Sequence, residues 1–358
     1  MSGITCPTFS FFMTSTTYSC TPSKTDTQRH DVPFIFGEAL SCTFGSQLAV
    51  NQVDFGIEKG QITAIIGESG SGKSSLLKLI YGLLEPAHGE VRFRGWRVPT
   101  RQDKLIPGHD DMKLVSQGFD DLNTYAKVWD NIASQLSNTN LTLKTARTQA
   151  VLQQLRIDHL SEKRVADLSG GEKQRVAISR ALINDPEVLL MDEPFNQVDA
   201  AFRDQLQHDI RKIVEETGLT VILVSHDPAE VLAMADKLIV MRKGKIVDQG
   251  RPTDLYYRPD TAYTARLLAK SNVLSSTEAK KLEIHSDQRV IVHQEHVQAI
   301  PSESGAYWIK DVRFRGFYNE VIAGDQHLTI HFIAYPVGEF QKGDRIALRI
   351  TDFHQLPK

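Results

Sequence analysis

The amino-acid sequence predicts an α/β fold, with helices on both faces of a mostly parallel sheet, followed by a smaller all-β domain. From about Ile35 to Ala269, short apolar segments alternate with helix-like segments, which is typical of a doubly wound parallel sheet. After Asn272, apolar and polar residues alternate, which is typical of antiparallel strands. A glycine-rich loop between a predicted strand and a predicted helix is the third observation, because doubly wound folds place such loops there.

The elements of the α/β part follow from apolar runs and helical periodicity. Between Gln117 and Asp167 the pattern is helical without strands, which predicts a helical insertion over about 118–167. We expect strands at 52–57, 61–66, 112–116, 187–191, 219–225 and 236–241. We expect helices at about 72–83, 128–137, 142–155, 171–184, 200–216 and 228–234.

The C-terminal pattern predicts a small antiparallel β-barrel over 276–358. Turn residues at 304–305, 324–325 and 343–344 separate its strand-like segments. These segments include Val290–Val292, Tyr307–Ile309, Leu328–Ile330 and Ile346–Ile350.

Length and composition exclude several classes of protein. The 358 residues correspond to two or three domains at roughly 150 residues each. The formal net charge of −3 gives no overall basic excess for binding nucleic acid. The three cysteines lack metal-binding spacing and are odd in number, which indicates a reducing compartment. Apolar runs are far shorter than the ~18 residues that cross a bilayer.

The N-terminal segment differs from the rest of the chain. Residues 1–23 contain no charged side chain and are rich in Ser and Thr. We expect 1–32 to be a disordered extension, and translation from Met13 is an alternative explanation for the segment.

A phosphate-binding loop follows the predicted strand at 61–66. The sequence matches G-x-x-x-x-G-K-[ST], for which about 0.01 chance matches are expected in a chain of this length. Backbone N–H groups of such a loop bind phosphate, Lys73 reaches the β- and γ-phosphates of ATP, and the hydroxyl of Ser74 binds Mg²⁺. The predicted nucleotide-binding residues are Gly67, Glu68, Ser69, Gly70, Ser71, Gly72, Lys73, Ser74 and Ser75.

Two carboxylates end the predicted strand at 187–191. Asp192 and Glu193 come after an apolar run, at the sheet edge where the phosphate loop also lies. We expect Asp192 to hold Mg²⁺ and Glu193 to deprotonate the attacking water.

Leu168-Ser169-Gly170-Gly171-Glu172 opens the predicted helix at 171–184. Ser169 and Glu172 have the spacing of a capping box, and two small residues expose the first N–H groups of the helix as a second anion site. The segment resembles the LSGGQ signature of ABC transporter ATP-binding subunits, with Glu172 as the departure.

This resemblance implies roles for further residues. Gln117 corresponds to the Q-loop glutamine, which ligates Mg²⁺ and links the nucleotide to the helical insertion, and His226 to the switch histidine that contacts the γ-phosphate. Asp199 is the retained aspartate of the D-loop, whose Asn196-Gln197-Val198 differs from the usual Ser-Ala-Leu. Phe44 lies where the family places an aromatic ring against adenine.

The C-terminal part resembles one group within the family. Residues 251–259 are similar to the segment that closes the ATPase domain in importers of iron, sulfate, polyamines and sugars, which implies an ATPase domain over 33–272. Residues 276–358 resemble their regulatory OB-like barrel, the TOBE domain. His293-Gln294-Glu295 stands where that group has Arg-Pro-Glu, and 117–132 lacks the usual proline-containing permease-facing pattern.

The resemblance implies an ATP-hydrolysing motor that uses ATP and Mg²⁺. Two copies would sandwich ATP on the inner face of the plasma membrane, bound to permease subunits and indirectly to an external solute-binding protein. An exporter subunit and a soluble regulatory ATPase are the alternatives.

The C-terminal segment also raises two weaker hypotheses. Its histidines could form a metal sensor, although no cysteine or acidic cluster completes a metal shell. A nucleic-acid-binding barrel is disfavoured because acidic and basic residues are nearly equal in number.

Overall fold

The computed structural model describes residues 33–45, 47–119 and 121–357. The expected N-terminal extension over 1–32, including Met13, lies outside the described residues.

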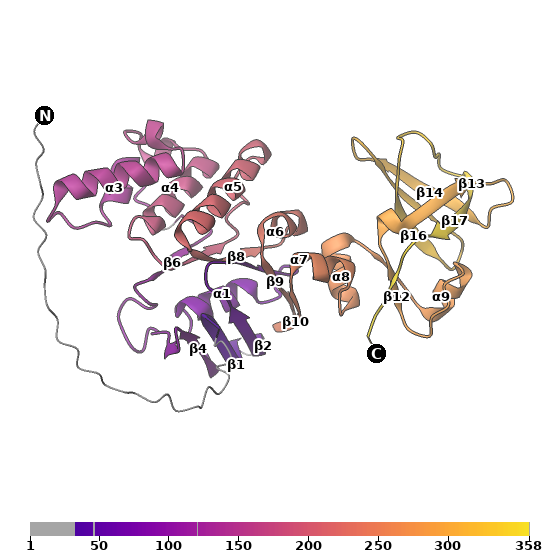
Figure 1. Ribbon diagram of the computed structural model, residues 1–358, viewed down its shortest axis with the longest axis horizontal. Coiled ribbons are helices and arrows are strands. Elements are labelled where there is room, and N and C mark those ends of the chain that lie inside the picture. Colours follow the sequence, from indigo (N-terminus) through magenta and orange to yellow (C-terminus); the bar gives the residue numbers. More distant parts are fainter. Residues whose placement is uncertain (1–32, 46, 120, 358) are drawn as a thin grey trace, which may run out of the picture. The chain divides into compact units, whose positions relative to one another are not determined.

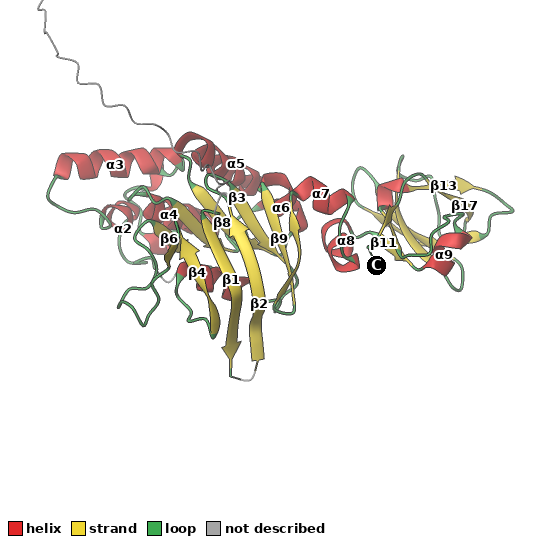
Figure 2. Ribbon diagram, turned by 60° about the horizontal axis from the view of Figure 1, so that its bottom comes forward, coloured by secondary structure: helices red, strands yellow, loops and turns green. Residues whose placement is uncertain are grey.

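A six-stranded sheet forms the centre of the α/β part (Figures 1 and 2). Five strands are parallel and β10 is antiparallel at one edge. Its central strands are buried along their whole length, as expected when both faces of a parallel sheet are covered. In sheet order the strands are β10 (Lys245–Gly250), β9 (Lys237–Arg242), β3 (Ile62–Ile66), β8 (Thr220–Ser225), β7 (Val188–Asp192) and β6 (Met112–Val115). The last five confirm predicted strands, whereas β10 was not predicted.

A four-stranded antiparallel sheet packs beside the parallel sheet, and only one of its strands was predicted, at 52–57. Its order is β2 (Gln47–Ile57), β1 (Ile35–Phe44), β4 (His88–Phe93) and β5 (Trp96–Arg97). Apolar residues of β1, β2 and β4 form one hydrophobic cluster with α1 (Lys73–Tyr81) and the face of the parallel sheet that carries Ile65. Helix α1 therefore lies between the two sheets.

Three further helices are associated with the other face of the parallel sheet (Figure 1). They are α4 (Gly170–Leu182), α5 (Ala200–Thr217) and α6 (Pro228–Met234). The helices α2 (Val128–Ala133) and α3 (Leu141–Gln154) lie within the range predicted for the helical insertion. Helix α2 is shorter than expected because the chain turns after Ala133.

Two short helices, α7 (Pro252–Tyr257) and α8 (Ala262–Ala269), connect β10 to the C-terminal region. That region contains β11 (Asn272–Leu274), α9 (Ser276–Lys281), β12 (Val290–Val292) and β18 (His354–Gln355). The three strands pair as β11-β12-β18.

The remaining C-terminal strands form a five-stranded antiparallel sheet, which confirms the β-rich character predicted for the region. Its core contains residues from both C-terminal sheets and from α9. Closure into an OB-like barrel remains a prediction. In sheet order the strands are β13 (Val297–Pro301), β17 (Arg345–Ile350), β14 (Tyr307–Phe314), β15 (Asn319–Gly324) and β16 (Thr329–Ala334).

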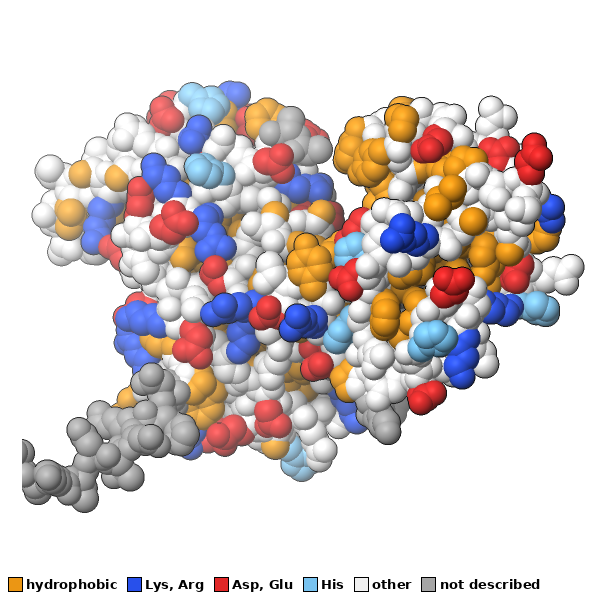
Figure 3. Space-filling model, turned by 45° about the vertical axis from the view of Figure 1, so that its right-hand side comes forward, with side chains coloured by type: hydrophobic (Ala, Val, Ile, Leu, Met, Phe, Trp, Pro, Cys, Tyr) orange, Lys and Arg blue, Asp and Glu red, His pale blue; other side chains and the backbone are white. Residues whose placement is uncertain are grey.

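Acidic and basic side chains are interspersed over the face shown in Figure 3. Among the residues with described placement, no helix is long and apolar enough to cross a bilayer. The same residues include no cluster of three or more His, Cys, Asp or Glu side chains arranged to hold a metal ion.

Candidate nucleotide site

The phosphate loop connects β3 to α1 and depends on two close backbone approaches. A Cβ atom at Gly67 would lie 2.2 Å from the carbonyl oxygen of Met241, and one at Gly72 would lie 2.3 Å from that of Ala49. Gly72 also has φ of 103°, a conformation that favours glycine. The loop can therefore keep this shape only with glycine at both positions.

Lys73 begins α1 and is only 5% exposed. Its Nζ donates hydrogen bonds to the carbonyl oxygens of Gly67 (2.9 Å) and Glu68 (3.0 Å). Burial lowers the pKa of Lys73, while the nearby carboxylates of Glu193 and Asp192 oppose that change. The ammonium group is thus held inside the curve of the loop.

Ser74 and Asp192 lie together at the start of α1 and the end of β7. The Ser74 hydroxyl donates a 2.8 Å hydrogen bond to Oδ1 of Asp192. Burial raises the pKa of Asp192, which is 8% exposed. A hydroxyl and a carboxylate are hard oxygen ligands that suit Mg²⁺, so this pair fits the metal role predicted for both residues.

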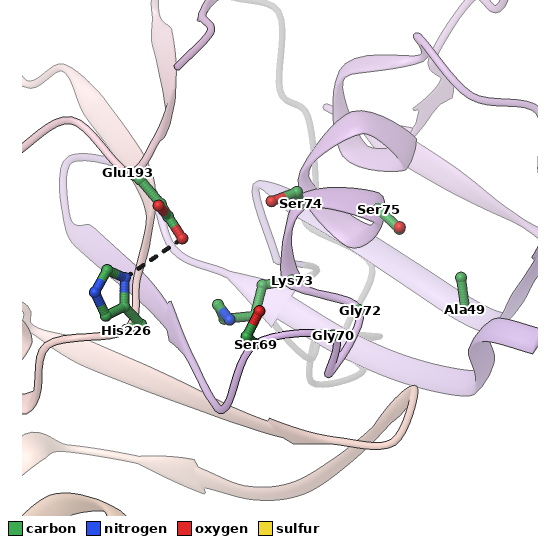
Figure 4. A pocket seen from close by; sticks show the side chains of 9 residues that line it. All are labelled: Ala49, Ser69, Gly70, Gly72, Lys73, Ser74, Ser75, Glu193 and His226. Carbon is green, nitrogen blue, oxygen red and sulfur yellow. Dashed lines mark ion pairs between the residues drawn. The ribbon is translucent and has the colours of Figure 1, made fainter. Parts of the chain in front are cut away.

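Glu193 is the point where three other side chains converge. Oε2 of Glu193 accepts hydrogen bonds from Nε2 of Gln117 (2.9 Å) and Nδ2 of Asn196. Nδ1 of His226 lies 3.5 Å from the other carboxylate oxygen, Oε1, as the dashed line in Figure 4 marks. Glu193 itself has φ of 52°, an uncommon backbone conformation of the kind that is enriched at functional sites.

Lys73, Glu193 and His226 border a cavity of about 510 Å³ (Figure 4). Ala49, whose carbonyl oxygen limits position 72 to glycine, is a lining residue that no sequence motif predicts. The contact of Asn196 with Glu193 is likewise not predicted, because only the fold brings its amide to that carboxylate. The residues lining the cavity are Ala49, Ser69, Gly70, Gly72, Lys73, Ser74, Ser75, Glu193 and His226.

Besides Asp192, four predicted residues of this region do not line the cavity. Gly67 and Ser71 are buried within the loop. The backbone N–H of Glu68 donates to the hydroxyl of Tyr263, and Gln117 contacts the site through Glu193. The side chain predicted to stack on adenine, that of Phe44, lies outside the described atoms.

Ser169 and Gly171 of the predicted signature line a second cavity, of about 520 Å³, instead of the first. Ser169 caps α4: its Oγ accepts from the N–H of Glu172 (3.3 Å), whose carboxylate accepts from the N–H of Ser169 (2.7 Å). Gly170 approaches the D-loop, since a Cβ there would lie 2.8 Å from the carbonyl oxygen of Gln197. Ser169, Gly171 and Asp199 all border this second cavity.

Comparison with known proteins identifies the α/β part. Residues 50–196 match the family model described as ABC transporter, and this range includes the phosphate loop, the signature and both carboxylates. The chain contains an ABC transporter ATPase domain.

Solved structures of ATP-binding cassettes share the fold. The cbiO1 protein of Clostridium perfringens, described as part of the ABC transporter complex cbiONQ, is 28% identical, with a TM-score of 0.58 and coverage of 63% of this chain and 91% of cbiO1. A nucleotide-free ABC transporter cassette is 26% identical, with a TM-score of 0.55 and coverage of 61% and 91%. A dimeric cassette solved in a post-hydrolysis state with ADP and Pi is 24% identical, with a TM-score of 0.53 and coverage of 61% and 98%, and shows similarity of fold.

Proposed function

We propose that this chain is the ATP-hydrolysing motor subunit of an ABC importer for a small solute or ion, and that two copies together form each ATP site. The observation that carries the proposal is the division of the ATPase domain into two cavities. One contains Lys73 and Glu193, whereas the other contains the N-terminus of α4 with Ser169.

The phosphate cavity supplies the groups for hydrolysis. Lys73 binds the β- and γ-phosphates, and backbone N–H groups of the loop bind the remaining phosphate oxygens. Ser74, Asp192 and Gln117 would hold Mg²⁺, which would neutralise phosphate charge when bound. Glu193 accepts a proton from the attacking water, and His226 contacts both Glu193 and the γ-phosphate.

The signature cavity supplies the remaining contacts to the ATP of a second copy. The capping box uses Ser169 Oγ as an acceptor, which leaves its hydroxyl proton available to a phosphate oxygen. The α4 N-terminus adds its positive dipole end. Asp199 lies beside this cavity, so the D-loop would reach the same interface.

The importer assignment also implies a role for the C-terminal region and a location for the protein in the cell. We assign 33–272 to the ATPase domain and 276–358 to a TOBE-type regulatory barrel. Attachment to the inner face of the plasma membrane would be through permease subunits, and an external solute-binding protein would act through them. That cbiO1 is part of a transporter complex supports a permease partner.

Reconstitution tests both the partner and the direction of transport. The full-length chain is purified with the multi-span membrane protein that accompanies it, and the complex is placed in liposomes with the ATPase facing outwards. An importer releases solute preloaded in the lumen when Mg-ATP is added outside. Loading of the lumen would identify an exporter, and undiminished turnover with no membrane partner would indicate a regulatory ATPase.

A further inference from the structure

Helix α8 contacts both the phosphate loop and the C-terminal region. It begins after Thr261, whose hydroxyl accepts from the N–H of Thr264 (3.0 Å), and ends at Lys270 in the left-handed conformation. Ala265 of α8 belongs to a small buried cluster with Ile291 of β12 and Leu356. The neighbouring Tyr263 points elsewhere, because its hydroxyl reaches the loop after β3.

The Tyr263 hydroxyl makes two hydrogen bonds. It accepts from the backbone N–H of Glu68 (3.0 Å) and donates to the carbonyl oxygen of Met241 (3.3 Å). Tyr263 is 9% exposed, and the guanidinium of Arg242 lies 4.7 Å from its ring centroid. Burial raises the pKa of Tyr263, so the hydroxyl keeps the proton that it donates.

Both hydrogen-bond partners of the Tyr263 hydroxyl, the N–H of Glu68 and the carbonyl oxygen of Met241, help to hold the phosphate loop in place. The carbonyl oxygen of Glu68 holds the ammonium of Lys73, so the peptide units on either side of Glu68 are fixed by Tyr263 and by Lys73. The carbonyl oxygen of Met241 is the atom that limits position 67 to glycine. The Tyr263 hydroxyl therefore links the loop to the end of β9 without occupying the phosphate cavity.

The C-terminal end of α8 is held by the neighbouring region. Ser271 Oγ donates its only proton to the carbonyl oxygen of Ala265 (3.0 Å), so Nδ1 of His293 must donate to Ser271 (2.9 Å). The His293 ring stacks on Tyr256 of α7, with centroids 4.9 Å apart. A shift of the segment that carries His293 would therefore move the last turn of α8.

We propose that Tyr263 is a positioning residue of the phosphate loop, and that α8 uses it to transmit the placement of the C-terminal region to ATP affinity. The proposal rests on the ATP-binding function proposed above. It assigns a regulatory connection to a single hydroxyl, which can be removed without changing the aromatic ring.

The first experiment compares Tyr263→Phe with the wild-type full chain. Tyr263→Phe removes both hydrogen bonds of the hydroxyl, and the loss of the one that holds the N–H of Glu68 should raise the Kd and KM for Mg-ATP about 2- to 10-fold, while kcat changes less than twofold. Amide hydrogen exchange over Gly67–Lys73 should also become faster in the nucleotide-free chain. Tyr307→Phe is the matched control, because that hydroxyl binds the carbonyl oxygen of Lys281 within the C-terminal region (3.0 Å) and should leave Kd unchanged.

The second experiment is a double-mutant cycle. Ser271→Ala should raise the Kd for Mg-ATP in the wild-type background and have no further effect in the Tyr263→Phe background. Additive effects, or no effect of Ser271→Ala, would overturn transmission through Tyr263. Equal Kd and exchange rates for wild type and Tyr263→Phe would overturn the positioning role alone, whereas a wild-type chain that binds no Mg-ATP would contradict the proposed function itself.

Discussion

The phosphate cavity and the signature cavity have similar volumes, about 510 and 520 Å³, but different chemical groups. Both lie at the N-terminus of a helix, α1 in the first and α4 in the second. The first has a buried lysine and a carboxylate held beside a histidine. In the second, the carboxylate of Glu172 is occupied by the capping box. This difference supports the proposal that the first cavity carries the chemistry and that the second completes the binding of the γ-phosphate.

The largest expected effect separates the chemistry from binding in the first cavity. Glu193→Gln removes the proposed general base and should lower kcat about 10²- to 10⁴-fold, while Mg-ATP still binds. Turnover and equilibrium nucleotide binding are measured on the same preparation. Glu58→Gln, at an exposed position after β2, is the control and should retain normal turnover. Near-normal hydrolysis by Glu193→Gln would show that Glu193 is not the general base.

The next effect concerns how the signature helix is held. Arg175 of α4 donates to Asp209 of α5 (2.9 Å) and to the carbonyl oxygen of Leu155 (2.9 Å), and both charged side chains are almost completely buried. Arg175→Met removes the buried charge partner of the Asp209 carboxylate. The free energy of unfolding should therefore fall by about 3–5 kcal/mol. Urea titration measures this change. Lys173→Met, at a half-buried position on the same helix, should cost much less.

A smaller effect tests the segment that contacts both cavities. Asn196 binds Glu193, whereas the next residue, Gln197, packs against Gly170 of the signature. Asn196→Ala removes one donor to the Glu193 carboxylate and should lower kcat about 2- to 10-fold with little change in the Kd for Mg-ATP. Gln197→Ala keeps that donor and should have a smaller effect on kcat. Equal losses in both variants would mean that loop packing, and not the amide of Asn196, determines the orientation of Glu193.

The phosphate loop and the parallel sheet could be predicted because their signals are local. The phosphate-loop motif tolerates few sequences and directly follows a buried strand. Short, fully apolar segments such as those of the central strands are typical of a parallel sheet. Strand β1 was missed because register shifts between Gly37 and Cys42, together with the positive φ of Ala39, interrupt the alternation that predicts strands.

The contacts of Tyr263 and Asn196 could not be predicted from such local signals. Tyr263 meets Glu68 across 195 positions of sequence, and the position of Asn196 depends on the turn that follows β7. Their residue types are common in loops and helices, so only the folded arrangement distinguishes them. The separation of Ser169 from the phosphate cavity is likewise a property of the fold, although the family resemblance implied it.

Mixing two inactive variants tests most directly whether each ATP site is shared between copies. Ser169→Arg should prevent hydrolysis but leave nucleotide binding by the single copy largely intact, whereas Lys73→Ala damages the phosphate cavity. In a mixed dimer, the intact phosphate cavity of one variant meets the intact signature of the other, while the second site is doubly damaged. Random pairing at equal concentrations should restore at most about a quarter of wild-type turnover. Turnover that stays at the level of the separate variants despite demonstrated mixed dimers, or undiminished hydrolysis by Ser169→Arg alone, would contradict the shared site.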